Sequence, residues 1–177
     1  MLKGTLITLV FLGLLASCTN QDTQELKNLE EEIKTTTATA NKNKASVRAF
    51  FQALEDENIN KLLSLFADNG KQINPYASGL FPEGATGKDE LKAYWSPVPE
   101  NFDGMEFPIE ELYAMEDPNI VFVKYKGRIK LKNDAGMYQN DYYSIFKFNA
   151  SGLVVEHVEI FNPILAARGF GLIDQIK

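Results

Sequence analysis

Residues 139–164 read QNDYYSIFKFNASGLVVEHVEIFNPI, two alternating runs on either side of the turn residues Asn149-Ala-Ser-Gly152. Alternation of apolar and polar side chains is typical of a half-buried β-strand, and Asn, Ser and Gly are typical of tight turns. The stretch therefore predicts a β-hairpin with one buried face.

The length of the loop predicts which side chains of this hairpin lie together. If Phe148 faces Leu153 across a four-residue turn, each further pair lies two residues along both strands. The pairs expected on this basis are Phe146 with Val155, Ser144 with His157, Tyr142 with Glu159, and Asn140 with Phe161. All these side chains then share one face, which changes from apolar near the turn to polar farther away.

Other strands are expected before the hairpin, and helices before those strands. Apolar residues alternate over 105–109 and 121–131, which predicts strands. Helical spacing of apolar residues occurs over 47–54 and 62–66, the second run after the capping residue Asn58.

A third helix is expected to begin at Thr86-Gly-Lys-Asp89 and to direct Leu91, Tyr94 and Trp95 inward, after a loop over residues 74–87. Helices followed by an antiparallel meander predict an α+β domain.

Composition excludes several classes of protein. The chain has 177 residues, of which 45% are hydrophobic and 24% charged, and this suits one compact domain with a short extension. With 18 Lys+Arg against 24 Asp+Glu, the net charge of −6 argues against nucleic-acid binding. One cysteine and one histidine exclude an internal disulfide and the usual zinc ligand sets. We therefore expect neither a metal nor a cofactor.

The first eighteen residues are typical of an exported protein. Lys3 precedes an apolar run over residues 6–15 that is too short to span a bilayer. The following Leu15-Ala16-Ser17-Cys18 resembles a bacterial lipobox. The resemblance implies a lipoprotein signal peptide over 1–17, removed by cleavage, and acyl chains such as palmitate on Cys18, which would anchor the protein stably. An ordinary secretory signal with an incidental cysteine is the alternative.

Residues 18–42 are polar and are expected to form a flexible tether. Leu26, Leu29 and Ile33 are the only sizeable apolar residues there, and their near-helical spacing leaves a short helix over Glu25–Lys34 as an alternative. Thr35–Ala40 is a weak helix former. The tether would join the lipid anchor to a globular domain over residues 43–177. We thus expect a lipid-anchored membrane protein of the bacterial cell envelope, facing the periplasm or the exterior.

From about residue 44 to 172 the chain resembles the nuclear-transport-factor-2-like, or SnoaL-like, superfamily, and within it the phenazine-biosynthesis A/B proteins. The likeness is carried by Gly87-Lys-Asp-Glu-Leu91, Glu116-Asp-Pro-Asn119, Gln139-Asn-Asp-Tyr142, Phe146-Lys-Phe148, Glu159-Ile-Phe-Asn-Pro-Ile164 and Ala167-Arg-Gly169. It implies a cone-shaped fold in which three N-terminal helices pack on a curved antiparallel sheet around a pocket. It also implies a homodimer formed through the sheet. Because the superfamily includes isomerases, cyclases, dehydratases and binding domains, the activity stays open.

The resemblance places Glu159 in the pocket. Burial among aromatic residues would raise the pKa of this carboxyl and enable it to transfer a proton near neutral pH, with His157 as a candidate partner. Both residues could instead be structural, with Glu159 bonded to Tyr142. We name Glu159 and His157 as the catalytic candidates. The candidate ligand contacts are Tyr142, Ser144, Asn140, Phe146, Phe161, Trp95 and Lys88.

Comparison with enzymes of the superfamily narrows the chemistry. The resemblance to ketosteroid isomerases aligns their oxyanion-hole groups with Phe50 and Ser144, and their base with Asn74. A phenyl ring cannot donate a hydrogen bond and an amide cannot abstract a proton, so that mechanism is excluded. In the phenazine A/B proteins a glutamate works with a histidine. Glu159 matches the glutamate, but Lys88 stands where the histidine would be.

Three functions remain open at this point. The first is a membrane-tethered domain that binds a small, largely apolar ligand, oriented by polar groups of the hairpin. The second is a SnoaL-type enzyme in which Glu159 transfers protons during cyclisation, dehydration or condensation. The third is an envelope scaffold that binds other proteins. A basic stripe over residues 124–130 is expected to be a solvated sheet face, with an anionic partner as the alternative.

Overall fold

The computed structural model describes the backbone of residues 5–175 and the side chains of residues 22–133 and 135–175. The chain divides into two units, Met1–Ala38 and Thr39–Lys177, and the helix α1 (Thr5–Glu55) begins in the first and ends in the second. The Cys18 side chain, on which the lipid anchor depends, lies outside the described side chains. Among the residues described, no helix is both long and apolar enough to cross a membrane.

The first unit differs from the flexible coil expected for residues 18–42, because this stretch is helical throughout. The Gln24 amide donates to Asn28 Oδ1 at 2.9 Å, and Lys34 Nζ lies 3.5 Å from Glu31 Oε2. Such pairs, one turn apart, each stabilise a helix by about 0.2–0.5 kcal/mol. The prediction considered the weak helix propensity of the threonines and left these local pairs out.

Short helices of the second unit begin near the residues that the sequence indicated. The side chain of Asn58 caps α2 (Ile59–Ser64) by accepting a hydrogen bond from the Lys61 N–H at 3.0 Å. At the start of α3 (Lys88–Trp95), Glu90 Oε2 accepts a hydrogen bond from the Thr86 N–H at 2.8 Å. The remaining helices are α4 (Val98–Asn101), α5 (Pro163–Gly169) and the 3-10 turns η1 (Lys132–Asp134) and η2 (Ile173–Gln175).

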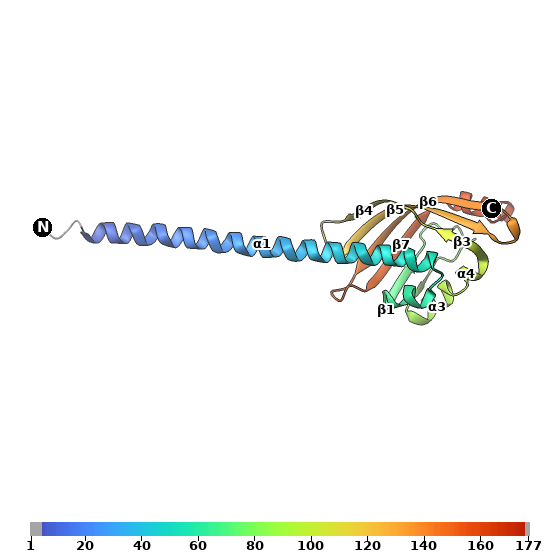
Figure 1. Cartoon of the computed structure of the whole chain (residues 1–177), viewed down its shortest axis with the longest axis horizontal. Coiled ribbons are helices and arrows are strands. Elements are labelled where there is room, and N and C mark those ends of the chain that lie inside the picture. The colour runs from blue at the N-terminus through green and yellow to red at the C-terminus, as the bar shows by residue number, and fades with distance from the viewer. Residues whose placement is uncertain (1–4, 176–177) are drawn as a thin grey trace. The chain divides into compact units, whose positions relative to one another are not determined.

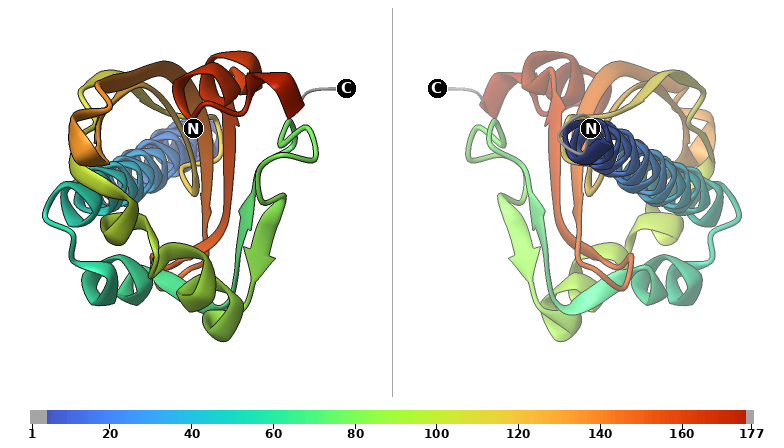
Figure 2. Two further views of the ribbon diagram at one scale, coloured as in Figure 1. Left: turned by 90° about the vertical axis from the view of Figure 1, so that its right-hand side faces the viewer. Right: turned by 90° about the vertical axis from the view of Figure 1, so that its left-hand side faces the viewer.

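Seven strands form one curled sheet beside the C-terminal part of α1 (Figures 1 and 2). They are β1 (Phe66–Ile73), β2 (Gly84–Thr86), β3 (Phe102–Glu106), β4 (Ile109–Ala114), β5 (Ile120–Leu131), β6 (Met137–Phe148) and β7 (Val154–Phe161). The order is β2-β1-β7-β6-β5-β3, with β4 also paired to β5. The α+β fold with helices packed on a curved sheet is confirmed.

The sheet is mixed where a purely antiparallel one was expected, because β1 runs parallel to β7. Phe66 is the first residue of β1, although the helical spacing of apolar residues over 62–66 predicted that it would end a helix. Asp68, Asn69 and Lys71 make β1 too polar to resemble a strand. Its pairing partner β7 lies more than 80 residues away in the chain. Only that long-range pairing turns the segment into a strand.

The last hairpin has the predicted face but a different register. Ser144 pairs with Glu159 and Phe146 with His157, a shift of two residues from the expected pairs. A bulge beside Phe148 and a five-residue loop, closed by two backbone N–H groups that donate to Asn149 Oδ1, account for the shift. Because side chains alternate with a period of two, the shift leaves His157 and Glu159 on the predicted face.

The basic stripe on the outer side of β5 is a solvated, ion-paired surface. Lys124 lies 3.1 Å from Glu110, and Lys126 lies 2.7 Å from Asp141. Arg128 is 3.9 Å from Glu106. Neighbouring carboxylates thus balance the stripe, as the solvated interpretation predicts.

Phe50 of α1 lies at the centre of the core between helix and sheet. It is 1% exposed. Its ring meets five others edge-on at centroid distances between 4.9 and 6.1 Å, namely Phe51, Phe66, Trp95, Phe146 and His157. This cluster joins α1 and α3 to β1, β6 and β7, and it buries His157.

Candidate functional site

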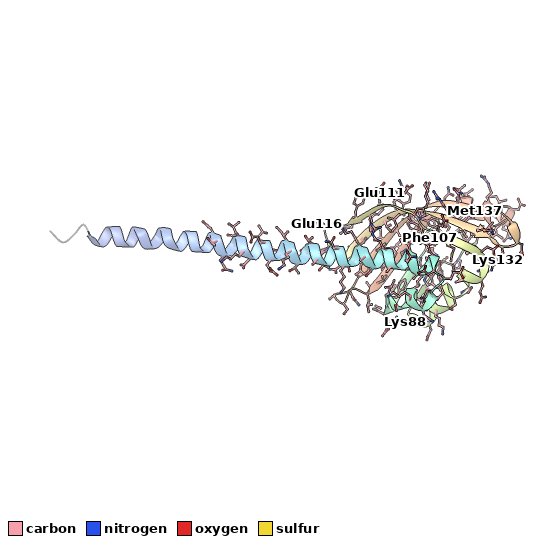
Figure 3. All side chains as sticks on the ribbon, viewed as in Figure 1. Lys88, Phe107, Glu111, Glu116, Lys132 and Met137 are labelled. Carbon is pink, nitrogen blue, oxygen red and sulfur yellow. The ribbon has the colours of Figure 1, made fainter. Side chains whose placement is uncertain are left out.

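A cavity of about 1230 Å³ lies in the second unit, lined by residues of the helices and of the curled sheet. Most of its lining is aromatic or aliphatic, which is typical of small-molecule sites. Phe107 and Lys132, both labelled in Figure 3, belong to the lining. The other aromatic members are Phe51, Phe81, Tyr94, Trp95, Phe102, Tyr125, Tyr142 and Phe170.

Glu159 is the carboxyl on the sheet wall of this cavity. Its Oε1 accepts a hydrogen bond from Tyr125 Oη at 2.5 Å. Burial raises the pKa of Glu159, and the Tyr125 hydrogen bond opposes part of that rise. The pKa of Tyr125 is also raised, first by burial and then by the Glu159 charge. The arrangement holds a carboxyl that keeps its proton more tightly than one in water.

A second polar group, Tyr94, faces the cavity from α3. Its hydroxyl oxygen accepts a hydrogen bond from Asn74 Nδ2 at 2.8 Å. Asn74 is fixed in turn, because it also donates to the Pro82 carbonyl at 2.8 Å and accepts from Gln72 Nε2 at 2.9 Å. Burial, followed by the charge of Glu159, raises the pKa of Tyr94, so this hydroxyl is neutral.

Tyr94, Tyr125 and Asn74 were not among the predicted site residues. A tyrosine on the core-facing side of a helix or strand could have indicated a site residue, because its buried hydroxyl needs a hydrogen-bond partner. Tyr94 and Tyr125 both carry that signal. Asn74 was considered only as a replacement for a catalytic base, whereas the structure gives it the task of orienting Tyr94.

Three of the predicted site residues line the cavity: Glu159, Tyr142 and Trp95. The Tyr142 hydroxyl is 2.9 Å from that of Tyr138. Its ring lies against Gly127, where an added Cβ would come within 2.6 Å of it. The missing side chain of Gly127 therefore leaves room for the Tyr142 ring in the cavity wall.

His157 lies in the core and not in the cavity lining, so the structure does not bring it together with Glu159. Its ring is fully buried, stacked on Phe146 at 4.0 Å and edge-on to Phe50 at 4.9 Å. Its Nε2 is 3.1 Å from Ser144 Oγ. Burial lowers the pKa of His157 to about 3. The partner of Glu159 is Tyr125, not the histidine expected from their spacing along the strand.

The other predicted ligand contacts also lie outside the lining. Ser144 lies between the rings of His157 and Tyr125, and Phe146 is core. Asn140 donates to Tyr138 and to the Asn162 carbonyl, where α5 begins. The ring of Phe161 packs against those of Phe81 and Tyr142.

Lys88, at the start of α3 (Figure 3), also lies away from the cavity. Its Nζ donates to the carbonyls of Leu63 and Phe66, both at 2.9 Å. The lysine thus ties α3 to the end of α2 and the start of β1. Within the described side chains there is also no group of three or more His, Cys, Asp or Glu residues that could hold a metal ion.

The raised pKa of Glu159 predicts that Glu159→Gln stabilises the protein at neutral pH. The native carboxyl holds its proton more tightly than the unfolded one, so its ionisation costs folding free energy. The cost is absent below the unfolded pKa of 4.5 and grows as pH rises toward the native value. We expect the variant to melt at a higher temperature than the wild type at about pH 8, and the difference to close near pH 4.

The matched control is Glu156→Gln, on the opposite face of the same strand. Glu156 lies 2.6 Å from Lys147. Its replacement removes an ion pair and should give no gain at either pH. Thermal unfolding followed by circular dichroism measures both variants. An equal gain in the two would contradict the assignment of Glu159 as a destabilised carboxylate.

The fold of this chain is similar to the folds of several proteins of known structure. A candidate isomerase from Bacillus subtilis is 20% identical, with a TM-score of 0.70 over 76% of this chain and 96% of that one. A phenazine biosynthesis-related protein from Pseudomonas aeruginosa is 20% identical, with a TM-score of 0.66 over 79% and 92%. An LEH-like epoxide hydrolase from M. tuberculosis is 16% identical, with a TM-score of 0.61 over 77% and 96%. At these identities the likeness shows the fold alone.

The sequence itself matches one family model. No curated protein matches the chain. The model of the SnoaL-like domain, however, covers residues 47–157, from the buried part of α1 to the middle of β7. That range is more than half of the 177 residues. The chain therefore belongs to the SnoaL-like domain family.

Proposed function

We propose that this protein is a ligand-binding domain that holds a small, largely apolar molecule in its cavity. The observation that carries the proposal is the cavity itself, about 1230 Å³ with a mostly aromatic and aliphatic lining. Removing apolar surface from water contributes about 25 cal/mol per Å², so such a lining favours an apolar guest. The few polar groups, Glu159, Tyr94 and Tyr142, would orient it.

A neutral fluorescent probe, N-phenyl-1-naphthylamine, tests the proposal. We expect the full chain to bind one probe molecule, with enhanced probe emission. Met105→Trp adds a ring to the lining and should weaken binding by about tenfold or more, since the ring occupies the guest's space. Met137→Trp makes the same change at an exposed position and should leave binding unaltered. Absence of binding by the wild type, or equal binding by both variants, would overturn the proposal.

We further propose that the domain is exported and lipid-anchored to a bacterial membrane through Cys18. The support is the lipobox-like Leu15-Ala16-Ser17-Cys18 after a short apolar run. Growth with an alkyne-tagged palmitate in a bacterial host should label the wild type, and Cys18→Ser should remove both the label and the membrane association. Labelling that persists in Cys18→Ser would refute the anchor.

A homodimer formed through the outer face of the sheet stays a prediction. The molecular mass of the purified protein in solution tests whether it is a dimer.

The raised pKa of Glu159 favours a second function, proton transfer to or from a bound ligand. An enzyme of this type needs an acid whose pKa lies close to the working pH. NMR of the protein with 13C-labelled glutamate carboxyls, assigned through Glu159→Gln, measures that pKa. A value at or below 4.5 would contradict catalysis by Glu159 and leave ligand binding as the function.

A further inference from the structure

Glu159 and Tyr94, both in the cavity lining, each have hydrogen-bonding capacity that no described protein group takes up. The Glu159 carboxyl uses Oε1 to accept from Tyr125. Among the side chains described, Oε2 has no hydrogen-bond partner and is not sealed from the cavity. It therefore offers an acceptor to whatever occupies the cavity.

Tyr94 offers the complementary group. Asn74 is held by the Pro82 carbonyl so that its Nδ2 donates to the Tyr94 oxygen. The hydroxyl hydrogen of Tyr94 then has no acceptor among the described residues and is free to donate. Asn74 thus fixes the direction of this hydrogen bond as well as the position of the ring.

The acceptor and the donor lie in one cavity but do not bond to each other. Both line it, Tyr94 from α3 and Glu159 from β7. The third hydroxyl of the wall, that of Tyr142, is already paired with Tyr138 at 2.9 Å. A guest atom between Glu159 and Tyr94 would meet one donor and one acceptor.

We propose that the ligand presents a hydroxyl group to Glu159 and Tyr94, donating to the Glu159 carboxyl and accepting from the Tyr94 hydroxyl. The inference rests on the proposed binding function and names the chemical class of the ligand, an apolar alcohol or phenol. An ether or ketone can only accept, so beside the ionised Glu159 carboxylate it would leave Oε2 without a donor. A carboxylate would place a second negative charge beside Glu159.

Three linear probes with alkyl chains of nine or ten carbons test the proposal, namely 1-decanol, decyl methyl ether and decanoate. The chain has one tryptophan, Trp95, and it lines the cavity, so its emission reports binding. At a pH above the pKa of Glu159 that the NMR titration measures, we expect the alcohol to bind about tenfold more tightly than the ether or the carboxylate, as a hydrogen bond to a carboxylate predicts.

Two variants separate the contributions of the two groups. Glu159→Gln turns an amide N–H toward the cavity, so the advantage of the alcohol over the ether should disappear. Tyr94→Phe removes the donor that both probes use, so both affinities should fall by about fivefold while their ratio stays. Tyr76→Phe, at an exposed loop position outside the lining, and Glu156→Gln are the matched controls. Circular dichroism verifies that each variant is folded.

The outcomes distinguish this inference from the function on which it rests. Equal binding of the three probes would overturn the hydroxyl assignment and leave apolar binding intact. Tightest binding of decanoate would also overturn it, and would point to Arg168 and Lys132, the cations of the lining. If none of the three binds and N-phenyl-1-naphthylamine also fails, the proposed function itself is wrong.

Discussion

The imidazole of His157 is expected to stay neutral from pH 8 down to about pH 4, although an exposed histidine titrates near pH 6.5. The ring is fully buried between Phe50 and Phe146, and no charged group is hydrogen-bonded to it. Burial therefore disfavours the imidazolium and holds the pKa at about 3. Since this is the only histidine of the chain, its proton NMR signals are identified without assignment.

The same burial makes the folded state sensitive to acid. The unfolded chain binds the histidine proton below pH 6.5, whereas the native chain does so only near pH 3. Stability is thus complete above pH 6.5 and is lost as pH falls between these values. At about 1.4 kcal/mol for each pH unit, the loss attributable to His157 reaches about 5 kcal/mol near pH 3.

Urea unfolding at several pH values measures this loss. His157→Phe keeps an aromatic ring against Phe146 but cannot bind a proton, so its stability should fall less steeply between pH 6.5 and pH 4 than that of the wild type. The comparison of slopes removes the effect of carboxylates, which titrate in both proteins. A histidine signal that titrates near pH 6.5 in the folded wild type would contradict the buried, neutral assignment.

Replacement of Phe50 by alanine is expected to destabilise the protein by about 3–5 kcal/mol, the usual cost of removing a buried aromatic ring. Phe50 is 1% exposed and touches rings of α1, α3, β1, β6 and β7. No neighbouring side chain can fill the space without leaving its own contacts, since close-packed cores relax only in part. Urea unfolding measures the change.

Tyr113→Ala is the matched control, because this aromatic ring on β4 is 56% exposed. Its removal should cost less than about 1 kcal/mol. If Phe50→Ala does not fold, Phe50→Leu provides a graded change with a smaller expected loss. A loss for Phe50→Ala no larger than that for Tyr113→Ala would show that α1 does not organise the core in this way.

Several parts of the fold were predictable because their signals are local. Asn58 caps α2 as the sequence indicates, since a capping residue acts within one turn of its own helix. At α3 the start was predicted within one or two residues, but the bond to the Thr86 N–H comes from Glu90 and not from Asp89, which the spacing had indicated. The hairpin face was predictable for a similar reason, because alternation decides which side chains share a face. The number of residues in its loop was not, because it depends on the bulge beside Phe148 and on hydrogen bonds to Asn149.

The site was predictable only in part. Glu159, Tyr142 and Trp95 line the cavity as expected, but His157 shares their side of the sheet without reaching it. Side chains on the same face of the sheet can contact one another. The helix packed on that face then determines which of these side chains it buries and which stay open to the cavity. Phe50 packs edge-on against His157, which is fully buried, and nothing in the alternation of β7 contains that information.

The sequence by itself determined the α+β class, the approximate starts of α2 and α3, the hairpin face and the SnoaL-like family, because caps, periodicity and turn residues act over a few residues. Only the tertiary structure decided that β1 runs parallel to β7, that Glu159 is paired with Tyr125, and that His157 is core. Each of these depends on the packing of segments far apart in the chain. Burial by this packing changes the protonation of both groups, because the loss of water disfavours their charged forms. It raises the pKa of Glu159 and lowers that of His157.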